Sequence, residues 1–232
     1  MSARGLFVVG TDTGVGKTRV AAALLRAYGR LGYRCVGMKP VAAGAEWQNG
    51  AWVNEDVLQL RVASNVEGPL AQVNPYLFRE AIAPHIAAEH KGVIIQLPRI
   101  RAAYEALAGL ADVVVVEGAG GFLVPLSRNE DMADLAVVLN LPVIMVVGMR
   151  LGCLNHALLT REAIAARGLN LAGWVANHID PAMAAYDENL ATLSERLAVP
   201  LLAELPFQPG QDMGLVADLF APKRLEALLS QG

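Results

Sequence analysis

The sequence predicts an α/β fold in which helices cover both faces of a mainly parallel, doubly wound sheet. Short unbroken apolar runs recur along the chain, and helical patterns separate them. Continuous runs of β-branched residues are typical of strands that are buried on both faces of a parallel sheet. Right-handed crossovers between such strands place a ligand crevice beyond their carboxyl ends. The runs predict strands over 5–10, 33–39, 112–118, 142–148, 171–177 and 201–206.

The helical patterns predict three helices, over 18–32, 154–168 and 184–199. A glycine ends each of the first two and a proline follows the third, and both are common helix stop signals. The longest apolar stretch, 135–149, contains Asn140 and Pro142 and is shorter than the roughly 18 residues that a membrane span requires. We therefore interpret it as the end of a helix followed by a buried strand.

The stretch 40–98 interrupts the alternation of strands and helices. It is rich in Gly, Asn and Pro, it keeps many apolar residues, and it is too long for a simple connection. We therefore expect an ordered insertion that lies over the crevice. Since no repeat, low-complexity segment or linker is present, residues 1–232 are expected to form a single domain.

Composition limits the partners that we expect for this chain. Of its 232 residues 54% are hydrophobic and only 18% are charged, so the excess apolar surface needs either burial on both sides or a subunit interface, and we favour a homo-oligomer. The net charge is -3 and the basic residues are scattered, which argues against a nucleic-acid partner. Cys35 and Cys153 are too few for a disulfide framework, and this favours a reducing compartment such as the cytoplasm.

The segment GTDTGVGKT, residues 10–18, is a candidate phosphate-binding loop because it follows a predicted strand and opens a predicted helix. Its glycines let backbone N–H groups converge on phosphate oxygens, its lysine reaches the outer phosphates, and its last threonine can bind Mg²⁺. The strict loop pattern would need glycine at Thr11, so an ordinary helix start with a solvated lysine is the alternative. The context favours a P-loop NTPase-like fold. The candidate residues are Gly14, Val15, Gly16, Lys17 and Thr18.

Charged residues at predicted strand and helix ends extend this candidate site. Glu117 ends the run VVVVE, where a carboxylate either binds Mg²⁺ or pairs with a lysine. Lys39 closes the run YRCVGMK, and it is either solvated or a fixed positive charge beside the phosphates. Asp56 follows the predicted helix cap Asn54, so it belongs either to the capping or to the site. The glycines that let the backbone approach a ligand are Gly118, Gly120 and Gly121.

The segment ANHID, residues 176–180, places Asn177 at another strand end. A carboxamide both donates and accepts hydrogen bonds, which suits the edge of a nucleobase. The segment is faintly similar to a guanine-reading N-K-x-D pattern, with His178 at the lysine position. The other histidines show no metal-ligand spacing, and no nucleophile with a base partner emerges from the sequence.

Eight motifs that follow one another in order give the chain a specific resemblance to the dethiobiotin synthetase family, the ATP-dependent carboxylases of biotin synthesis. They run from Gly10 to about Pro206 and therefore cover most of the chain. The family's loop has the form G-T-x-T-x-V-G-K-T, which accounts for the extra residue. The motifs are GTDTGVGKT, GMKPVAAG, NEDVLQL, VNPYLF, APHIAAE, VVVEGAGGFLVPL, LPVIMVVGMRLGCLNHALLT and LAGWVANHI.

The resemblance implies a reaction in which 7,8-diaminononanoate, CO₂ and ATP give dethiobiotin, ADP and phosphate. It implies catalytic roles for Lys17, Lys39 and Thr13, and a magnesium site at Thr18, Asp56 and Glu117. In the family the substrate's distant carboxylate is held by a helix start of the partner subunit, so a homodimer is implied. The remaining residues implied to bind the nucleotide are Arg19, Gly118, Ala119, Gly120, Asn177, His178, Pro206 and Phe207, and those implied to bind the substrate are Lys39, Ala43, Gly152, Cys153, Leu154 and Asn155.

The chain departs from the family pattern in two places. It has Ala43 where family members commonly carry a serine that touches the substrate, so we predict weaker substrate affinity. The last 25 or so residues match poorly. Two rival classes share the loop: nucleotide-switched partner proteins, which carry a signature lysine where this chain has Asp12, and amidotransferase-like synthetases, which need a glutamine-handling domain or partner.

Overall fold

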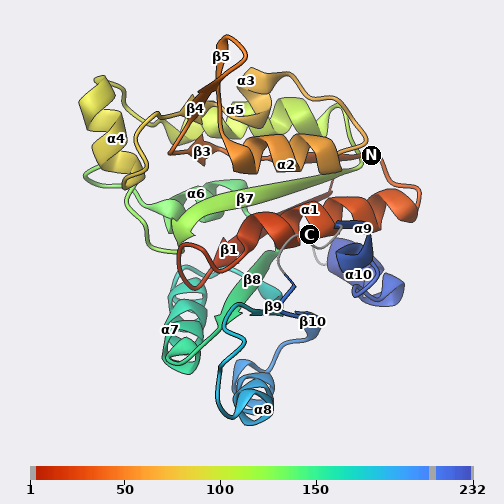
Figure 1. Cartoon of the computed structure of the whole chain (residues 1–232). Coiled ribbons are helices and arrows are strands. Elements are labelled where there is room, and N and C mark those ends of the chain that lie inside the picture. The colour runs from red at the N-terminus through yellow and green to blue at the C-terminus, as the bar shows by residue number, and fades with distance from the viewer. Residues whose placement is uncertain (1–3, 209–212, 231–232) are drawn as a thin grey trace.

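The centre of the molecule is a six-stranded sheet in which every neighbouring pair of strands is parallel (Figure 1). The computed structural model describes residues 4–208 and 213–230. The strand order is β10-β9-β8-β1-β7-β2. All six predicted strands and the parallel sheet are confirmed. The strands are β1 (Arg4–Gly10), β2 (Cys35–Met38), β7 (Val113–Gly121), β8 (Val143–Met149), β9 (Leu171–His178) and β10 (Leu201–Leu205).

The strand order reverses direction at β1, which lies between β7 and β8. After β1 the chain first builds one side of the sheet with β2 and β7, and then builds the other side with β8, β9 and β10. In open parallel sheets such a switch point is where ligands bind, beyond the carboxyl ends of the strands. The loop that follows β1 lies at this point.

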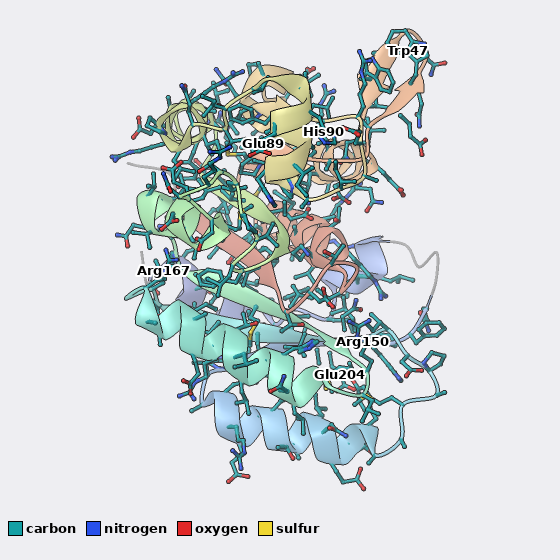
Figure 2. All side chains as sticks on the ribbon, turned by 90° about the vertical axis from the view of Figure 1, so that its left-hand side faces the viewer. Trp47, Glu89, His90, Arg150, Arg167 and Glu204 are labelled. Atoms are coloured by element: carbon teal, nitrogen blue, oxygen red, sulfur yellow. The ribbon has the colours of Figure 1, made fainter. Side chains whose placement is uncertain are left out.

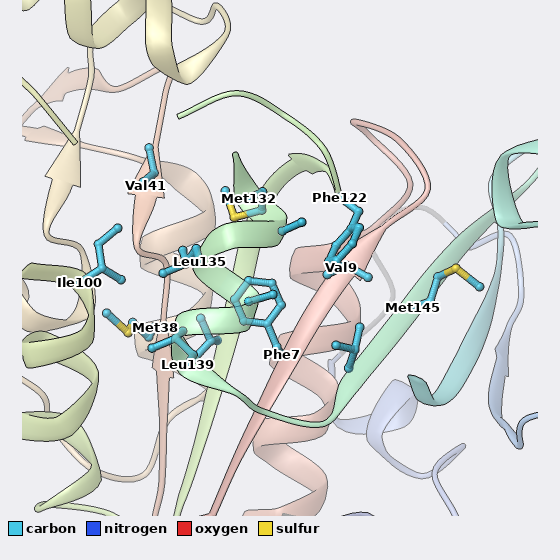
Figure 3. Packing of buried hydrophobic residues seen from close by; sticks show 14 of the residues in the cluster. Phe7, Val9, Met38, Val41, Ile100, Phe122, Met132, Leu135, Leu139 and Met145 are labelled. Atoms are coloured by element: carbon cyan, nitrogen blue, oxygen red, sulfur yellow. The ribbon is translucent and has the colours of Figure 1, made fainter. Parts of the chain in front are cut away.

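Helices cover both faces of the sheet, as the doubly wound prediction requires. Along β1 the side chains alternate, because Leu6 and Val8 pack with α1, α9 and α10, whereas Phe7 and Val9 pack with helices on the opposite face (Figure 3). The three predicted helices are confirmed, with ends that shift by one or two residues. The covering helices are α1 (Lys17–Arg30), α9 (Met213–Ala217) and α10 (Pro222–Leu229) on one face, and α5 (Leu97–Ala108), α6 (Met132–Leu139), α7 (Cys153–Ala166) and α8 (Tyr186–Leu197) on the other.

The long apolar stretch 135–149 contains the end of α6 and the whole of β8, as interpreted from the sequence. Every residue of β8 is buried. Within residues 4–208 and 213–230, no helix combines the length and the apolar character needed to cross a membrane.

The insertion is ordered, and α2 at its middle closes the β2 edge of the sheet. Val57 and Leu60 of α2 belong to the cores on opposite faces of the sheet. Asn54 caps α2 as predicted, since its Oδ1 accepts a hydrogen bond of 3.3 Å from the Val57 N–H. Trp47 extends from the β4–β5 hairpin away from the sheet (Figure 2). The insertion comprises β3 (Val41–Ala42), β4 (Glu46–Gln48), β5 (Ala51–Val53), α2 (Glu55–Ala63), α3 (Leu70–Val73), β6 (Tyr76–Leu77) and α4 (Pro84–Lys91).

Candidate active site

The loop between β1 and α1 requires glycine at position 16 on two independent grounds. Gly16 has a φ of 93°, in the left-handed region that side chains disfavour. A Cβ atom at Gly16 would lie 2.1 Å from Nδ2 of Asn177, which is closer than any real contact. No side chain in the described ranges caps the start of α1. Because α1 follows the loop after β1, its first N–H groups lie at the carboxyl edge of the sheet, where they could donate hydrogen bonds to a phosphate.

The register of the sheet brings Glu117 and Lys39 beside this loop. Val8 of β1 pairs with Glu117 of β7, and Met38 of β2 pairs with the residue before Glu117. Lys39 directly follows Met38, so its side chain reaches the same edge. Its ammonium lies 2.6 Å from Oε1 of Glu117 and 2.8 Å from Oδ2 of Asp56. Lys39 and Glu117 are 4% and 1% exposed, which makes this a buried ion pair.

The hydroxyl of Thr18 links the two carboxylates. Its Oγ1 lies 2.8 Å from Oδ1 of Asp56 and 2.8 Å from Oε1 of Glu117. A hydroxyl has one proton and can donate to only one of them at a time. Oε2 of Glu117 is buried and has no hydrogen-bond partner within the described part of the chain. Two carboxylates and a hydroxyl that converge with spare lone pairs fit the oxygen ligands that Mg²⁺ prefers.

The two lysines of the site differ in their electrostatics. Burial, followed by the nearby charge of Lys39, lowers the pKa of Lys17 to about 8. Burial alone would also lower the pKa of Lys39, but the carboxylates of Glu117 and Asp56 outweigh it and raise this pKa. Burial raises the pKa of Glu117, and Lys39 opposes that effect only in part. Lys39 is therefore held as a paired cation, whereas Lys17 is the less stable charge.

The Lys17 ammonium contacts the loop itself, and no carboxylate of the described residues lies at ion-pair distance from it. It donates a hydrogen bond of 2.9 Å to the main-chain oxygen of Asp12. The Asp12 carboxylate accepts from the Thr13 N–H at 2.7 Å and pairs with Arg150 at 2.6 Å. Asp12 thus joins the loop to the segment before α7, where Figure 2 places Arg150. Sequence reasoning treated Asp12 only as a missing lysine, since no local pattern connects it with a partner 138 residues away.

The residues expected around a nucleobase meet on the β9 side of the loop. Asn177 is buried, and its side chain donates to the Val15 oxygen at 2.8 Å and accepts from Arg19 at 3.1 Å. Arg19 also donates to the Pro206 oxygen at 3.3 Å. The His178 ring lies 6.4 Å from the half-exposed ring of Phe207. Asn177 therefore supports the loop, and its contact with a base stays a prediction.

Leu151 and Gly152 lie exposed just before α7, at the helix start predicted to bind an anion. Gly152 has a φ of 94°, and no side chain in the described ranges caps the helix. Leu151, just before it, is 95% exposed. A hollow of about 390 Å³ lies between the loop and α7, and Thr13, Leu123 and Leu159 are among its lining residues.

Comparisons with known proteins show the family to which this chain belongs. Residues 4–212 match the family model described as an AAA domain. The chain is 59% identical to the ATP-dependent dethiobiotin synthetase BioD of Aromatoleum aromaticum, over 92% of the chain and 95% of that protein. It belongs to the dethiobiotin synthetase family. A second dethiobiotin synthetase, from Nitrosospira multiformis, is 54% identical over 90% of the chain and 91% of its own length.

Solved structures place this dethiobiotin synthetase family member among P-loop NTPase-like folds. It superposes on the septum site-determining protein MinD complexed with Mg-ADP from Pyrococcus horikoshii with a TM-score of 0.60, at 16% identity and over 97% and 96% of the two chains. The cell division ATPase MinD of Pyrococcus furiosus gives a TM-score of 0.59, at 15% identity and over 99% of each chain. At such identities the likeness shows the fold alone, and it confirms the predicted fold class.

Proposed function

We propose that this chain is an ATP-dependent dethiobiotin synthetase, which converts 7,8-diaminononanoate, CO₂ and ATP into dethiobiotin, ADP and phosphate. The observation that carries the proposal is the charge cluster at the carboxyl edge of the sheet. Lys39 and the three oxygen-bearing side chains meet within hydrogen-bond distance beside a glycine loop, and Lys17 of that loop lies near enough for their charges to affect its pKa. The chain that builds this cluster is 59% identical to an enzyme of that name.

The reaction needs positioned charge and no side-chain nucleophile. One amine of the substrate adds to CO₂ and forms a carbamate. A carbamate oxygen attacks the γ-phosphorus of ATP, and ADP leaves. The second amine then attacks the carbamate carbon, which closes the cyclic urea and releases phosphate. Negative charge builds on the transferred phosphoryl group and its neighbours, and fixed ammonium groups stabilise it.

In this proposal the two lysines act at different points of the substrates. Lys17 lies at the start of α1, which no described side chain caps, and would bind the outer phosphates of ATP. Lys39, which directly follows β2, would neutralise the carbamate and the transferred phosphoryl group. Thr13, at the exposed tip of the loop, would face the reacting groups.

We propose that Thr18, Asp56 and Glu117 hold a Mg²⁺ ion that comes with ATP. Such an ion would neutralise phosphate charge during transfer. Two observations support this assignment: Oε2 of Glu117 has no hydrogen-bond partner among the described residues, and Thr18 has a single proton for two carboxylates. The described residues contain no group of three His, Cys, Asp or Glu side chains that could hold a metal by itself, so phosphates would complete the ligand set.

We also propose that residues 1–232 act as one cytoplasmic domain that forms a homodimer, with the start of α7 from the partner subunit binding the substrate carboxylate. The exposed apolar side chains Leu151, Leu159 and Leu123 near the loop and α7 support an interface here. The residues proposed to hold the carboxylate are Gly152, Cys153, Leu154 and Asn155.

The main experiment supplies the purified protein with diaminononanoate, bicarbonate, Mg²⁺ and ATP. ADP should appear in step with a product of dethiobiotin mass, and Lys39→Gln should abolish turnover while Mg-ATP binding persists. ADP release that does not depend on the diamine would favour a nucleotide-switched partner protein and overturn the proposal.

Mixed dimers test the shared site. Lys39→Gln damages the transfer site, and Asn155→Glu places a negative charge at the α7 start, so each variant alone should be inactive. In a statistical mixture half of the dimers are mixed, and each mixed dimer has one intact site, so about a quarter of the wild-type activity should return. If no activity returns from subunits shown to exchange, the cross-subunit arrangement is wrong.

A further inference from the structure

Three buried asparagines each donate a side-chain amide to a main-chain oxygen of the candidate site. They are the only asparagines among the seven buried polar residues of the described ranges. Asn177 donates to the Val15 oxygen at 2.8 Å. Asn54 donates to the Ala43 oxygen at 3.1 Å, and Asn74 donates to the Lys39 oxygen at 2.6 Å. All three carbonyls belong to segments proposed to bind the nucleotide or the substrate.

We propose that Asn74 is a positioning residue, which fixes the main chain of Lys39 so that the ammonium points into the transfer site. The inference rests on the proposed function, because it assigns Asn74 a role in that reaction. Asn74 lies in the insertion, 35 residues beyond Lys39, and belongs to none of the predicted site residues.

The main chain of Lys39 is fixed by the insertion, because Lys39 lies just beyond the end of β2. β2 ends at Met38, and Pro40 has no N–H to offer. The Lys39 N–H donates to the Val73 oxygen at 2.8 Å, and its carbonyl accepts from Asn74. Both backbone groups of Lys39 are therefore held by two consecutive residues of the insertion.

Only a donor fits at position 74. The Asn74 amide nitrogen donates to the Lys39 oxygen and to the Tyr76 oxygen at 3.1 Å, and both partners are pure acceptors. An apolar or ionised side chain would leave the Lys39 carbonyl without its partner in a buried place. The main chain of Lys39 would then shift, and catalytic groups lose rate steeply when they are misplaced by about 1 Å.

The test compares Asn74→Leu and Asn74→Asp with Asn65→Leu. Asn65 is a matched control because it holds the other end of β2, where its side chain accepts from the Cys35 N–H and donates to the Tyr33 oxygen. We expect kcat for dethiobiotin formation to fall at least tenfold in Asn74→Leu, with the Kd for Mg-ATP changed less than threefold. Asn65→Leu should keep kcat within threefold of the wild type.

The pH dependence of kcat in Asn74→Asp distinguishes a positioning role from a purely structural one. A protonated carboxyl can donate to the Lys39 oxygen, and a carboxylate cannot. The kcat of Asn74→Asp relative to the wild type should therefore rise at least threefold from pH 8.5 to pH 6, whereas the ratio for Asn74→Leu should stay flat. Equal kcat losses in Asn74→Leu and Asn65→Leu, or a flat ratio for Asn74→Asp, would overturn the inference.

A labelling measurement keeps the inference separate from the proposed function. Lys39 is 5% exposed at its side chain and should resist acetylation, whereas Lys223 is exposed and serves as an internal reference. Asn74→Leu should raise Lys39 acetylation relative to Lys223 at least threefold, and unchanged labelling would count against the inference. Absence of diamine turnover in the wild-type protein would instead overturn the proposed function, and the labelling result would still stand.

Discussion

The two buried lysines of the site should respond oppositely when each is replaced by methionine, which keeps most of the side-chain volume and removes the charge. Without ligands Lys17→Met should stabilise the protein at pH 7, whereas Lys39→Met should destabilise it. The reason is that Lys39 has two carboxylate partners, whereas Lys17 has none at ion-pair distance within residues 4–208 and 213–230. A contrast of sign is a stronger test than either value alone.

The magnitude for Lys17 follows from its pKa, which burial lowers from 10.5 to about 8. That depression corresponds to about 3 kcal/mol, at about 1.4 kcal/mol per pH unit. Removal of the charge regains this energy, and loss of the hydrogen bond to the Asp12 oxygen takes back about 1 kcal/mol. We therefore expect Lys17→Met to raise the free energy of unfolding by about 2 kcal/mol at pH 7.

The stability difference between Lys17→Met and the wild type should depend on pH. Below pH 8 Lys17 is protonated in both the folded and the unfolded protein, so the folded protein bears the full penalty. Between pH 8 and 10.5 the folded protein releases the proton while the unfolded chain still binds it, so wild-type stability rises with pH. The advantage of Lys17→Met should therefore shrink over this window and disappear above it.

Lys39→Met leaves Glu117 buried without its partner, which costs about 3–5 kcal/mol. Because burial already raises the pKa of Glu117, lower pH should neutralise the acid and relieve part of this loss. Urea unfolding at one protein concentration, without nucleotide, measures both variants. If both lose stability, or if the Lys17→Met gain is the same at pH 7 and above pH 10.5, the electrostatic reasoning is wrong.

Three further predictions concern the loop, the substrate and the metal. Gly16→Ala should weaken Mg-ATP binding at least tenfold in calorimetry, because its Cβ would displace Asn177; wild-type affinity would contradict this. Ala43→Ser should lower the KM for the diamine about two- to tenfold, as a regained hydroxyl contact of about 0.5–1.5 kcal/mol requires, and an unchanged KM would count against that contact. Asp56→Asn should raise the Mg²⁺ concentration for half-maximal activity at least tenfold, and an unchanged Mg²⁺ requirement would remove Asp56 from the metal site.

The sequence predicted the features that depend on local patterns. The apolar runs identified all six strands, and the loop motif predicted a site at the carboxyl end of β1. The apolar runs also placed Lys39 and Glu117 at strand ends, and the structure joins these two side chains in an ion pair because their strands are parallel neighbours. What the sequence did not predict are contacts between distant loops. Asp12 pairs with Arg150, and Asn74 donates to the Lys39 oxygen, only because the fold brings these distant segments together. No periodicity or spacing in the sequence predicts such pairs.

The charges of the site explain why it can exist without ligand and still bind one. Lys39 forms an ion pair with Asp56 and another with Glu117, so the charges in this part of the site are compensated without a ligand. Lys17 is the exception, since its charge is buried beside another cation and rests on a single carbonyl. A polyphosphate would supply the missing negative charge and raise the pKa of Lys17 again. The free-energy penalty of burying the Lys17 charge would therefore be relieved when ATP binds, and this relief would add to the binding affinity. For this reason Lys17 should be unfavourable for folding and essential for binding.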